Sequence, residues 1–197
     1  MSTSAGMSLR GKLMALSAAT VAALVLLFAV SLNNTKIQLL QDRQEKIRNL
    51  VEVAHATLAH YEKEGREGRM PMDEAKTAAM NTIRTMRYDK NEYFWINDFT
   101  PTTLMHPIRP ELQGKSMAEV KDPTGKILFV EFVKVVKASG AGYVDYLWPK
   151  PGSDTPVQKI SYVKGFEPWG WIVGTGIYTD DVDVLFREQA IRFLAWG

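Results

Sequence analysis

The sequence predicts an α+β domain that follows an N-terminal membrane-spanning helix. Three observations support this: an uncharged apolar run near the N-terminus, apolar residues at steps of three and four over residues 37–61, and later segments with strand and turn composition. Helices that precede strands in this way are typical of a domain in which helices pack on one face of an antiparallel sheet.

Composition limits the class of protein. The chain has 197 residues, 46% hydrophobic and 23% charged, which favours one folded domain plus a membrane segment over a multi-domain enzyme. Cysteine is absent, so disulfides, thiol nucleophiles and cysteine-bound metals are excluded. Two of the 24 basic residues, Arg10 and Lys12, precede the apolar run, and the other 22 balance 22 acidic residues, which gives no support to nucleic-acid binding.

The apolar run covers residues 13–32, twenty residues without a charge. At about 1.5 Å per residue, a helix of this length spans roughly 30 Å of hydrocarbon. Because Arg10 and Lys12 precede it, residues 1–12 are expected in the cytoplasm and everything after Asn33 outside it. The alternatives are a buried core helix and a signal peptide cleaved at residues 29–31, but the run exceeds the usual ~7–15 apolar residues of a signal.

Two helices are predicted after the anchor. The first ends where residues 65–69 introduce glycines, and Pro71 marks the start of a second helix that ends near Arg87. His55 and His60 are five residues apart, which is not a usual metal-ligand spacing on a helix. The seam of the first helix suits either the domain's own sheet or a second copy of the chain, and consists of Ile37, Leu40, Gln44, Ile47, Val51, Ala54, Leu58 and Tyr61.

The strands follow these helices. Residues 93–96 and 103–105 predict a hairpin around a turn at 97–101, and the sequence allows a short helix between Pro110 and Val120. The remaining predicted elements are a helix over residues 126–138, a meander of strands over 143–148, 157–164 and 171–178, and a final helix over 180–196, of which residues 187–197 lead toward a second membrane span.

No motif typical of an enzyme is present. The sequence lacks a Gly-rich phosphate loop, a nucleophile elbow and a metalloprotease motif. Gly174 and Gly176 fall inside a predicted strand and are interpreted as allowing close approach of a neighbouring strand. His106 has no serine or cysteine near it in the sequence and is a poor candidate for a general base. The protein is therefore predicted not to be an enzyme and to need neither a metal nor a cofactor.

Cations and aromatic residues interleave in the predicted sheet. Strand alternation places Lys159 and Ser161 on one face, and His106 lies just after the hairpin in a turn stiffened by prolines. A site for a small carboxylate needs cations, hydrogen-bond donors and apolar walls. The alternative is that the cations are solvated and the aromatic residues are core. The predicted ligand-binding residues are Tyr93, Trp95, His106, Arg109, Tyr146, Trp148 and Lys159.

Several sequence blocks together resemble a known family. They are Glu92–Asp98, Met105-His106-Pro107, Lys121–Lys126, Gly142–Tyr146, Lys159–Val163 and Pro168–Tyr178. In this order they are similar to the single Cache sensor domain of bacterial methyl-accepting chemotaxis receptors, and the resemblance covers residues 34–186. It implies a periplasmic domain over residues 33–186, with a long N-terminal helix and a PAS-like antiparallel sheet, that binds short organic acids directly.

The resemblance also implies roles for particular residues and a homodimer. It assigns Tyr93, Trp95, His106 and Lys159 to the ligand pocket, whereas Arg109 and the aromatic residues at 146 and 148 depend on position and chemistry. Such a receptor continues into a second membrane helix and a cytoplasmic coiled coil. Related sensor domains also sit on histidine kinases and cyclases, so the output stays open. The competing hypothesis is an anchored module whose sheet binds a protein partner.

Overall fold

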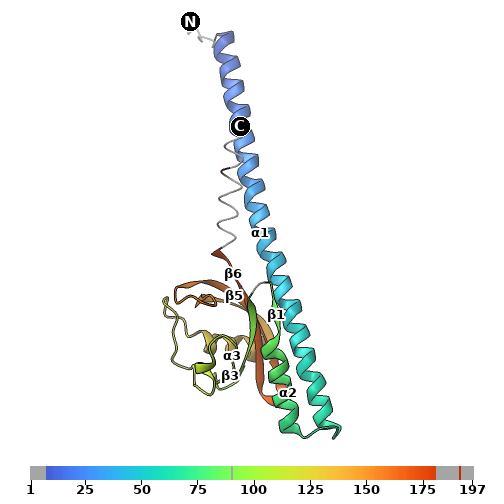
Figure 1. Ribbon diagram of the computed structural model, residues 1–197. Coiled ribbons are helices and arrows are strands. Elements are labelled where there is room, and N and C mark those ends of the chain that lie inside the picture. Colours follow the sequence, from blue (N-terminus) through green and yellow to red (C-terminus); the bar gives the residue numbers. More distant parts are fainter. Residues whose placement is uncertain (1–7, 90, 181–190, 192–197) are drawn as a thin grey trace.

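The computed structural model describes residues 8–89, 91–180 and 191 and confirms the α+β class. A long helix, α1 (Leu9–Arg66), carries the chain into the domain, and α2 (Met72–Thr85) returns alongside its C-terminal part (Figure 1). A six-stranded antiparallel sheet lies against these helices, and α3 (Leu128–Ser139) covers the opposite face of the sheet. Up to the end of the last strand the predicted order is confirmed with two differences: a two-residue strand precedes the hairpin, and the segment after Pro110 forms only a short 3-10 turn.

Helix α1 has two chemically different parts. Its apolar window has a mean hydropathy of 2.5 and none of it is buried, so the buried-core alternative is wrong and the helix is long and apolar enough to cross a membrane. Farther along, Ile47, Val51, Ala54 and Leu58 are fully buried against the sheet. This part of the predicted seam therefore packs within the domain.

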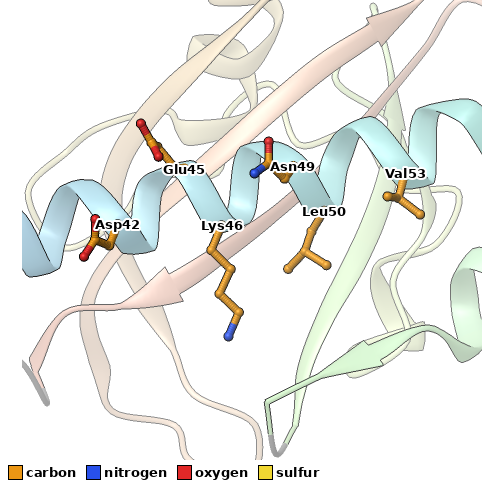
Figure 2. Close-up of a pocket in the computed structure, with 6 residues that line it drawn as sticks. All are labelled: Asp42, Glu45, Lys46, Asn49, Leu50 and Val53. Atoms are coloured by element: carbon orange, nitrogen blue, oxygen red, sulfur yellow. The ribbon is translucent and has the colours of Figure 1, made fainter.

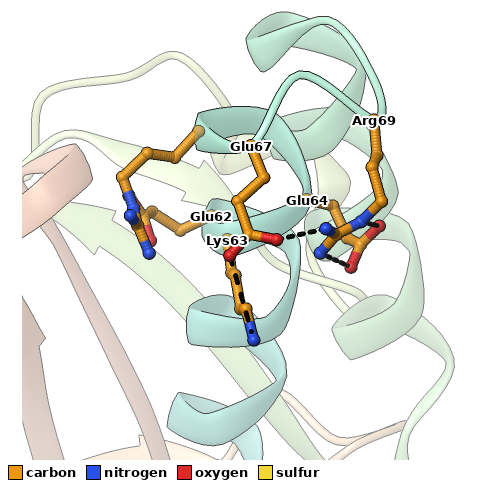
Figure 3. Close-up of polar contacts among 6 residues, drawn as sticks. Glu62, Lys63, Glu64, Glu67 and Arg69 are labelled. Carbon is orange, nitrogen blue, oxygen red and sulfur yellow. Dashed lines mark hydrogen bonds and ion pairs between the residues drawn. The ribbon is translucent and has the colours of Figure 1, made fainter.

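The predicted break between the two helices is confirmed at the end of the helical hairpin. Arg69 folds back so that its guanidinium donates to Glu64 at 2.5 and 2.6 Å and also contacts Glu67 (Figure 3). The amide of Glu67 donates to the carbonyl of Lys63 at 2.9 Å and closes the last turn of α1. Helix α2 then ends at Thr85, slightly before the predicted end, because the chain turns into a strand.

The sheet has the strand order β1-β2-β6-β5-β4, and β3 pairs with β2 on the side away from β6. The last strand therefore lies between β2 and β5, and brings residues from opposite ends of the domain together. The strands are β1 (Arg87–Tyr88), β2 (Glu92–Asp98), β3 (Thr103–Met105), β4 (Ala141–Pro149), β5 (Pro156–Phe166) and β6 (Trp171–Tyr178).

The short helix allowed between Pro110 and Val120 is reduced to one 3-10 turn over Pro110–Leu112. The reason is backbone pairing. The carbonyl of Thr103 accepts from the amide of Gly114 at 2.7 Å, and the amide of Thr103 donates to the carbonyl of Lys115 at 3.1 Å. These bonds hold the segment beside β3 and leave no room for a longer helix.

Side chains of the sheet alternate between two cores. Phe94 and Ile96 face α1, whereas Tyr93 and Trp95 face α3. The second core is rich in aromatic rings because α3 contributes Phe132 opposite them. The candidate site lies in this second core. The predicted final helix over residues 180–196 lies almost entirely outside the described residues.

Candidate ligand-binding site

Lys159 lies at the centre of the second core. Its side chain is 0% exposed, with Tyr146 and Tyr178 opposite it on the two neighbouring strands. Its ammonium donates to the hydroxyls of Tyr93 at 3.3 Å and Tyr178 at 3.4 Å. The same nitrogen lies 4.4 Å from the ring centre of Tyr93, 4.6 Å from that of Tyr178 and 5.7 Å from that of Trp95. Aromatic faces and phenol oxygens therefore surround this charge.

No carboxylate of the described chain forms an ion pair with this ammonium. Its polar partners are neutral phenols, and cation–π attraction offsets only part of the desolvation of a buried charge. The charge of Glu92 contributes to raising the pKa of Tyr146 and that of Tyr178, but Glu92 forms no ion pair with Lys159. The predicted alternative of a solvated lysine is wrong, and the site carries one buried positive charge that lacks a fixed counter-ion.

Two glycines of β6 make this packing possible. A Cβ on Gly174 would lie 2.6 Å from the ring of Trp95, and a Cβ on Gly176 would lie 3.0 Å from Cε of Lys159. Neither position leaves space for a side chain, because the large residues of β2 and β5 lie directly across β6. The interpretation of these glycines as allowing close approach is confirmed.

His106 is a buried, neutral hydrogen-bonding group, 2% exposed. Its Nδ1 accepts from the amide of Arg109 at 3.0 Å, so the proton of the neutral ring is on Nε2. Burial, followed by the charges of Lys159 and Arg109, lowers the pKa of His106 to about 3. The ring centre lies 5.0 Å from that of Tyr93 and 6.3 Å from that of Trp148, at the wall of the lysine cluster.

This burial predicts a pH dependence of stability. The unfolded chain protonates His106 near its ordinary pKa of 6.5, whereas the folded chain resists protonation down to about 3. Between these values the unfolded state binds more protons, so the free energy of unfolding falls as the pH falls, by at most ~1.4 kcal/mol per pH unit. We expect urea unfolding to show this slope between about pH 6.5 and 4.5.

The matched control is His106→Asn, which keeps an acceptor near the amide of Arg109 and cannot titrate. We expect its slope to be shallower in the same range, where the contribution of His55 remains because burial lowers its pKa as well. Asp122 contributes a separate loss of stability only below its ordinary pKa of 3.8. Equal slopes for the two proteins above about pH 4.5 would show that His106 is not held neutral by the fold.

The remaining predicted residues extend the cluster outward. The hydroxyl of Tyr146 lies 2.9 Å from that of the buried Ser161, and Trp148 packs against Tyr146 and His106. Arg109 lies at the outer edge, with its guanidinium 5.6 Å from the ring of Trp148 and 29% of its side chain exposed. All seven predicted residues therefore gather on one side of the sheet: five are buried, Trp148 is half-buried and Arg109 lies at the rim.

An aspartate clamps the loop that precedes α3 onto β4. Asp122 accepts from the amide and hydroxyl of Thr124, from the amide of Lys126 and from the amide of Leu147. Desolvation raises the pKa of Asp122, but the amide of Leu147 and the other donors outweigh it and lower the pKa to about 2. Because Leu147 lies between Tyr146 and Trp148, the clamp fixes the backbone that carries both aromatic residues.

Sequence reasoning missed Tyr178 and Phe132. Tyr178 touches Lys159 directly, and Phe132 packs against Trp95 and Tyr146. A signal for Tyr178 was available, since it shares the alternating face of β6 with Gly174 and Gly176. No signal in the sequence distinguished Phe132 from the other apolar residues of its helix.

A sequence profile described as the Cache domain matches residues 4–195 of the chain. The chain belongs to the Cache domain family. This confirms the resemblance seen in the sequence.

Two curated relatives show where this Cache domain occurs. The methyl-accepting chemotaxis protein McpP of Pseudomonas putida is 39% identical over 189 residues, which are 96% of the chain and 35% of that protein. The sensor histidine kinase MctS of Rhizobium johnstonii is 29% identical over 153 residues, 77% of the chain and 32% of that protein. The chain thus spans about a third of the length of these relatives.

Solved structures agree with the fold. A periplasmic sensor domain of a chemotaxis protein has a TM-score of 0.71 and 51% identity, covering 72% of this chain and 98% of that one. A Cache chemosensory domain described for its carboxylic acid recognition has a TM-score of 0.70 and 44% identity, covering 73% of this chain and 97% of that one. The Cache domain described here is therefore a sensor domain of the kind that chemotaxis receptors carry.

Proposed function

We propose that the Cache domain senses short monocarboxylates outside the cytoplasmic membrane, as the ligand-binding portion of a chemoreceptor. The observation that carries this proposal is the ammonium of Lys159, which is fully buried and lacks an ion-pair partner among the described residues. An anion supplied by a ligand would complete this site. The carboxylic acid recognition described for a structural neighbour 44% identical to the chain supports the same class of ligand.

The charge of the site favours one carboxylate over other small ions. Lys159 contributes the one buried positive charge among the described residues, and His106 is held neutral by a pKa of about 3. Arg109 at the rim already pairs with Asp154 at 3.5 Å. A second carboxylate would bring an additional negative charge into a buried space, and an amino acid would bring an ammonium close to that of Lys159. Both would remain uncompensated, so dicarboxylates and amino acids are expected to bind weakly.

Donors and walls around Lys159 suit a short acid. The hydroxyls of Tyr93 and Tyr178 and the Nε2 proton of His106 are available to a carboxylate beside the ammonium. Burial raises the pKa of Tyr178 above its usual range, so this hydroxyl stays a donor. The rings of Trp95, Phe132 and Trp148 provide apolar surface for a short tail.

The proposed membrane topology is based on the apolar part of α1 and on the similarity to chemotaxis receptors. Residues 1–12 lie in the cytoplasm, 13–32 cross the inner membrane, 33–186 form the periplasmic sensor and 187–197 lead back toward the membrane. Similarity to McpP favours a chemotaxis output, and similarity to MctS makes a histidine kinase sensor the second candidate. The domain to which this sensor is joined would distinguish the two candidates, since a methyl-accepting coiled coil and a kinase domain have different sequences.

We further propose that the sensor forms a homodimer through the outer face of α1. On this face a shallow groove of about 490 Å³ runs along consecutive turns of the helix (Figure 2). Val53 is 60% exposed there, although it belongs to a helix whose other side is packed on the sheet. The groove is lined by Asp42, Glu45, Lys46, Asn49, Leu50 and Val53.

Thermal unfolding of the full chain in detergent, with a panel of small ligands, tests the proposed function. A ligand at 100 times its dissociation constant stabilises a protein by ~2.7 kcal/mol, or about 5–10 °C for a chain of this size. We expect this shift with acetate or propionate, and little or none with succinate, alanine or ethylamine. Sedimentation of the same samples reports the dimer. An equal shift with ethylamine, or none with any carboxylate, would contradict the proposal.

A further inference from the structure

Tyr178 connects the candidate site to the edge of the domain where the described chain leaves the sheet. Its hydroxyl accepts from the ammonium of Lys159 at 3.4 Å and donates to the carbonyl of Pro149 at 2.7 Å. Pro149 is the last residue of β4, so this bond ties the end of β6 to the start of the β4–β5 turn. The same side chain therefore touches the buried charge and a peripheral loop.

The loop beyond Pro149 is joined in turn to Asp180, just beyond the end of β6. Lys150 places its ammonium 5.6 Å from the ring centre of Tyr178 and 2.7 Å from Oδ2 of Asp180. Asp180 is two residues beyond Tyr178. Tyr178, although buried, lines with Lys150 a cavity of about 590 Å³ that reaches Lys46 of α1.

A phenol has one proton and therefore donates one hydrogen bond. In the structure Tyr178 donates to Pro149, a neutral acceptor. A carboxylate bound at Lys159 would lie within reach of the same hydroxyl, because the hydroxyl already contacts the ammonium. Hydrogen bonds to charged acceptors are about twice as strong as those to neutral ones, so the carboxylate competes successfully for the proton.

We propose that Tyr178 couples ligand binding to the segment after Asp180 by transferring its one hydrogen bond from the carbonyl of Pro149 to the bound carboxylate. Loss of that bond releases the start of the β4–β5 turn and with it Lys150. The ion pair between Lys150 and Asp180 carries the displacement to the residues that leave the sheet. This inference rests on the proposed carboxylate site and adds a role for Tyr178, Lys150 and Asp180 in transmission.

The test uses distance measurements between spin labels in the full chain. The protein has no cysteine, so Asn34→Cys on α1 and Ile191→Cys beyond the sheet, both at exposed positions, can be labelled specifically. With saturating acetate we expect the distance to change by about 1–2 Å, as in small interface shifts of helices. In Tyr178→Phe we expect acetate affinity to fall by about tenfold, and the distance change to disappear even at saturation.

Asp180→Asn separates transmission from binding, since Asp180 lies outside the ligand site. We expect its affinity for acetate to equal that of the wild type and its distance change to be reduced. The matched control is Tyr61→Phe, which removes a phenol bond to Thr82 between α1 and α2 and should alter neither quantity.

The outcomes distinguish the two proposals. If wild-type protein does not bind acetate in calorimetry, the carboxylate site and the coupling are both wrong. If it binds acetate but its distance stays fixed, or if saturated Tyr178→Phe shows the full wild-type change, the coupling through Tyr178 is wrong and the carboxylate site stands.

Discussion

Replacing Lys159 with methionine is expected to abolish carboxylate binding while leaving the fold intact. The substitution removes the only buried ammonium of the described second core, so a bound carboxylate would be left uncompensated, which costs ~3–5 kcal/mol. This corresponds to a loss of affinity of at least a hundredfold. Isothermal calorimetry with acetate measures it directly.

The same variant is expected to be at least as stable as the wild type. In the ligand-free protein the ammonium of Lys159 is desolvated among phenols and rings, and a methionine of similar length fits an aromatic cage without that penalty. Urea unfolding should therefore give an unchanged or higher free energy of unfolding. Functional sites often contain groups that lower the stability of the free protein but are needed to bind the ligand.

Lys164→Met is the matched control, because Lys164 lies on the same strand but pairs with Glu52 of α1 and is partly exposed. We expect it to bind acetate like the wild type. If Lys159→Met also binds acetate with wild-type affinity, the anion site is elsewhere. If Lys159→Met is strongly destabilised, the lysine has a structural role that the geometry does not account for.

Gly176→Ala is expected to have the largest effect on stability. The new Cβ would lie 2.1 Å from Oγ of Ser161 and 2.6 Å from the carbonyl oxygen of Ile160. The backbone oxygen cannot move without separating β5 from β6, so the overpacking is expected to cost about 3 kcal/mol or more. Thermal unfolding should show a fall of about 6–12 °C in Tm.

Gly140→Ala provides the comparison. Gly140 has a φ of 74° at the end of α3, and a Cβ there meets nothing within 4 Å. Its substitution therefore lowers the free energy of unfolding only by the cost of holding alanine in a left-handed backbone conformation, about 1–2 kcal/mol. The double variant Ser161→Gly with Gly176→Ala should recover part of the loss, because one of the two close contacts is removed. Equal losses for Gly140→Ala and Gly176→Ala would show that β5 and β6 are less tightly packed than the geometry requires.

Local patterns were sufficient to predict the elements of the fold. The anchor, the two helices and the meander each depend on apolar periodicity and turn residues within one segment. The predictions failed at the segment between Pro110 and Val120, where pairing of Thr103 with Gly114 and Lys115 replaced a helix. Hydrogen bonds between residues distant in sequence decided that conformation, and no local pattern reports them.

For the site, the sequence predicted which residues share a face but not how deeply they are buried. Alternation placed Lys159 and Ser161 on one face, and the structure agrees, since both contact tyrosines of the second core. The sequence left open whether this lysine is solvated. The structure decides the question because α3 and the residues around His106 close that face, and because β6 lies between β2 and β5.

The sequence alone therefore determined the long apolar helix, the class of fold, the alternating faces and the chemical types available for a ligand. These depend on short-range periodicity, which each segment carries independently. The tertiary structure alone decided that Lys159 lacks an ion-pair partner in the described chain, that His106 is neutral and that Tyr178 joins the site to Pro149. Burial, desolvation and hydrogen-bond partners are set by the strands and helices that surround a residue, and this sheet assembles them from segments more than 80 residues apart in sequence, as the bond between Thr175 and the carbonyl of Tyr93 shows.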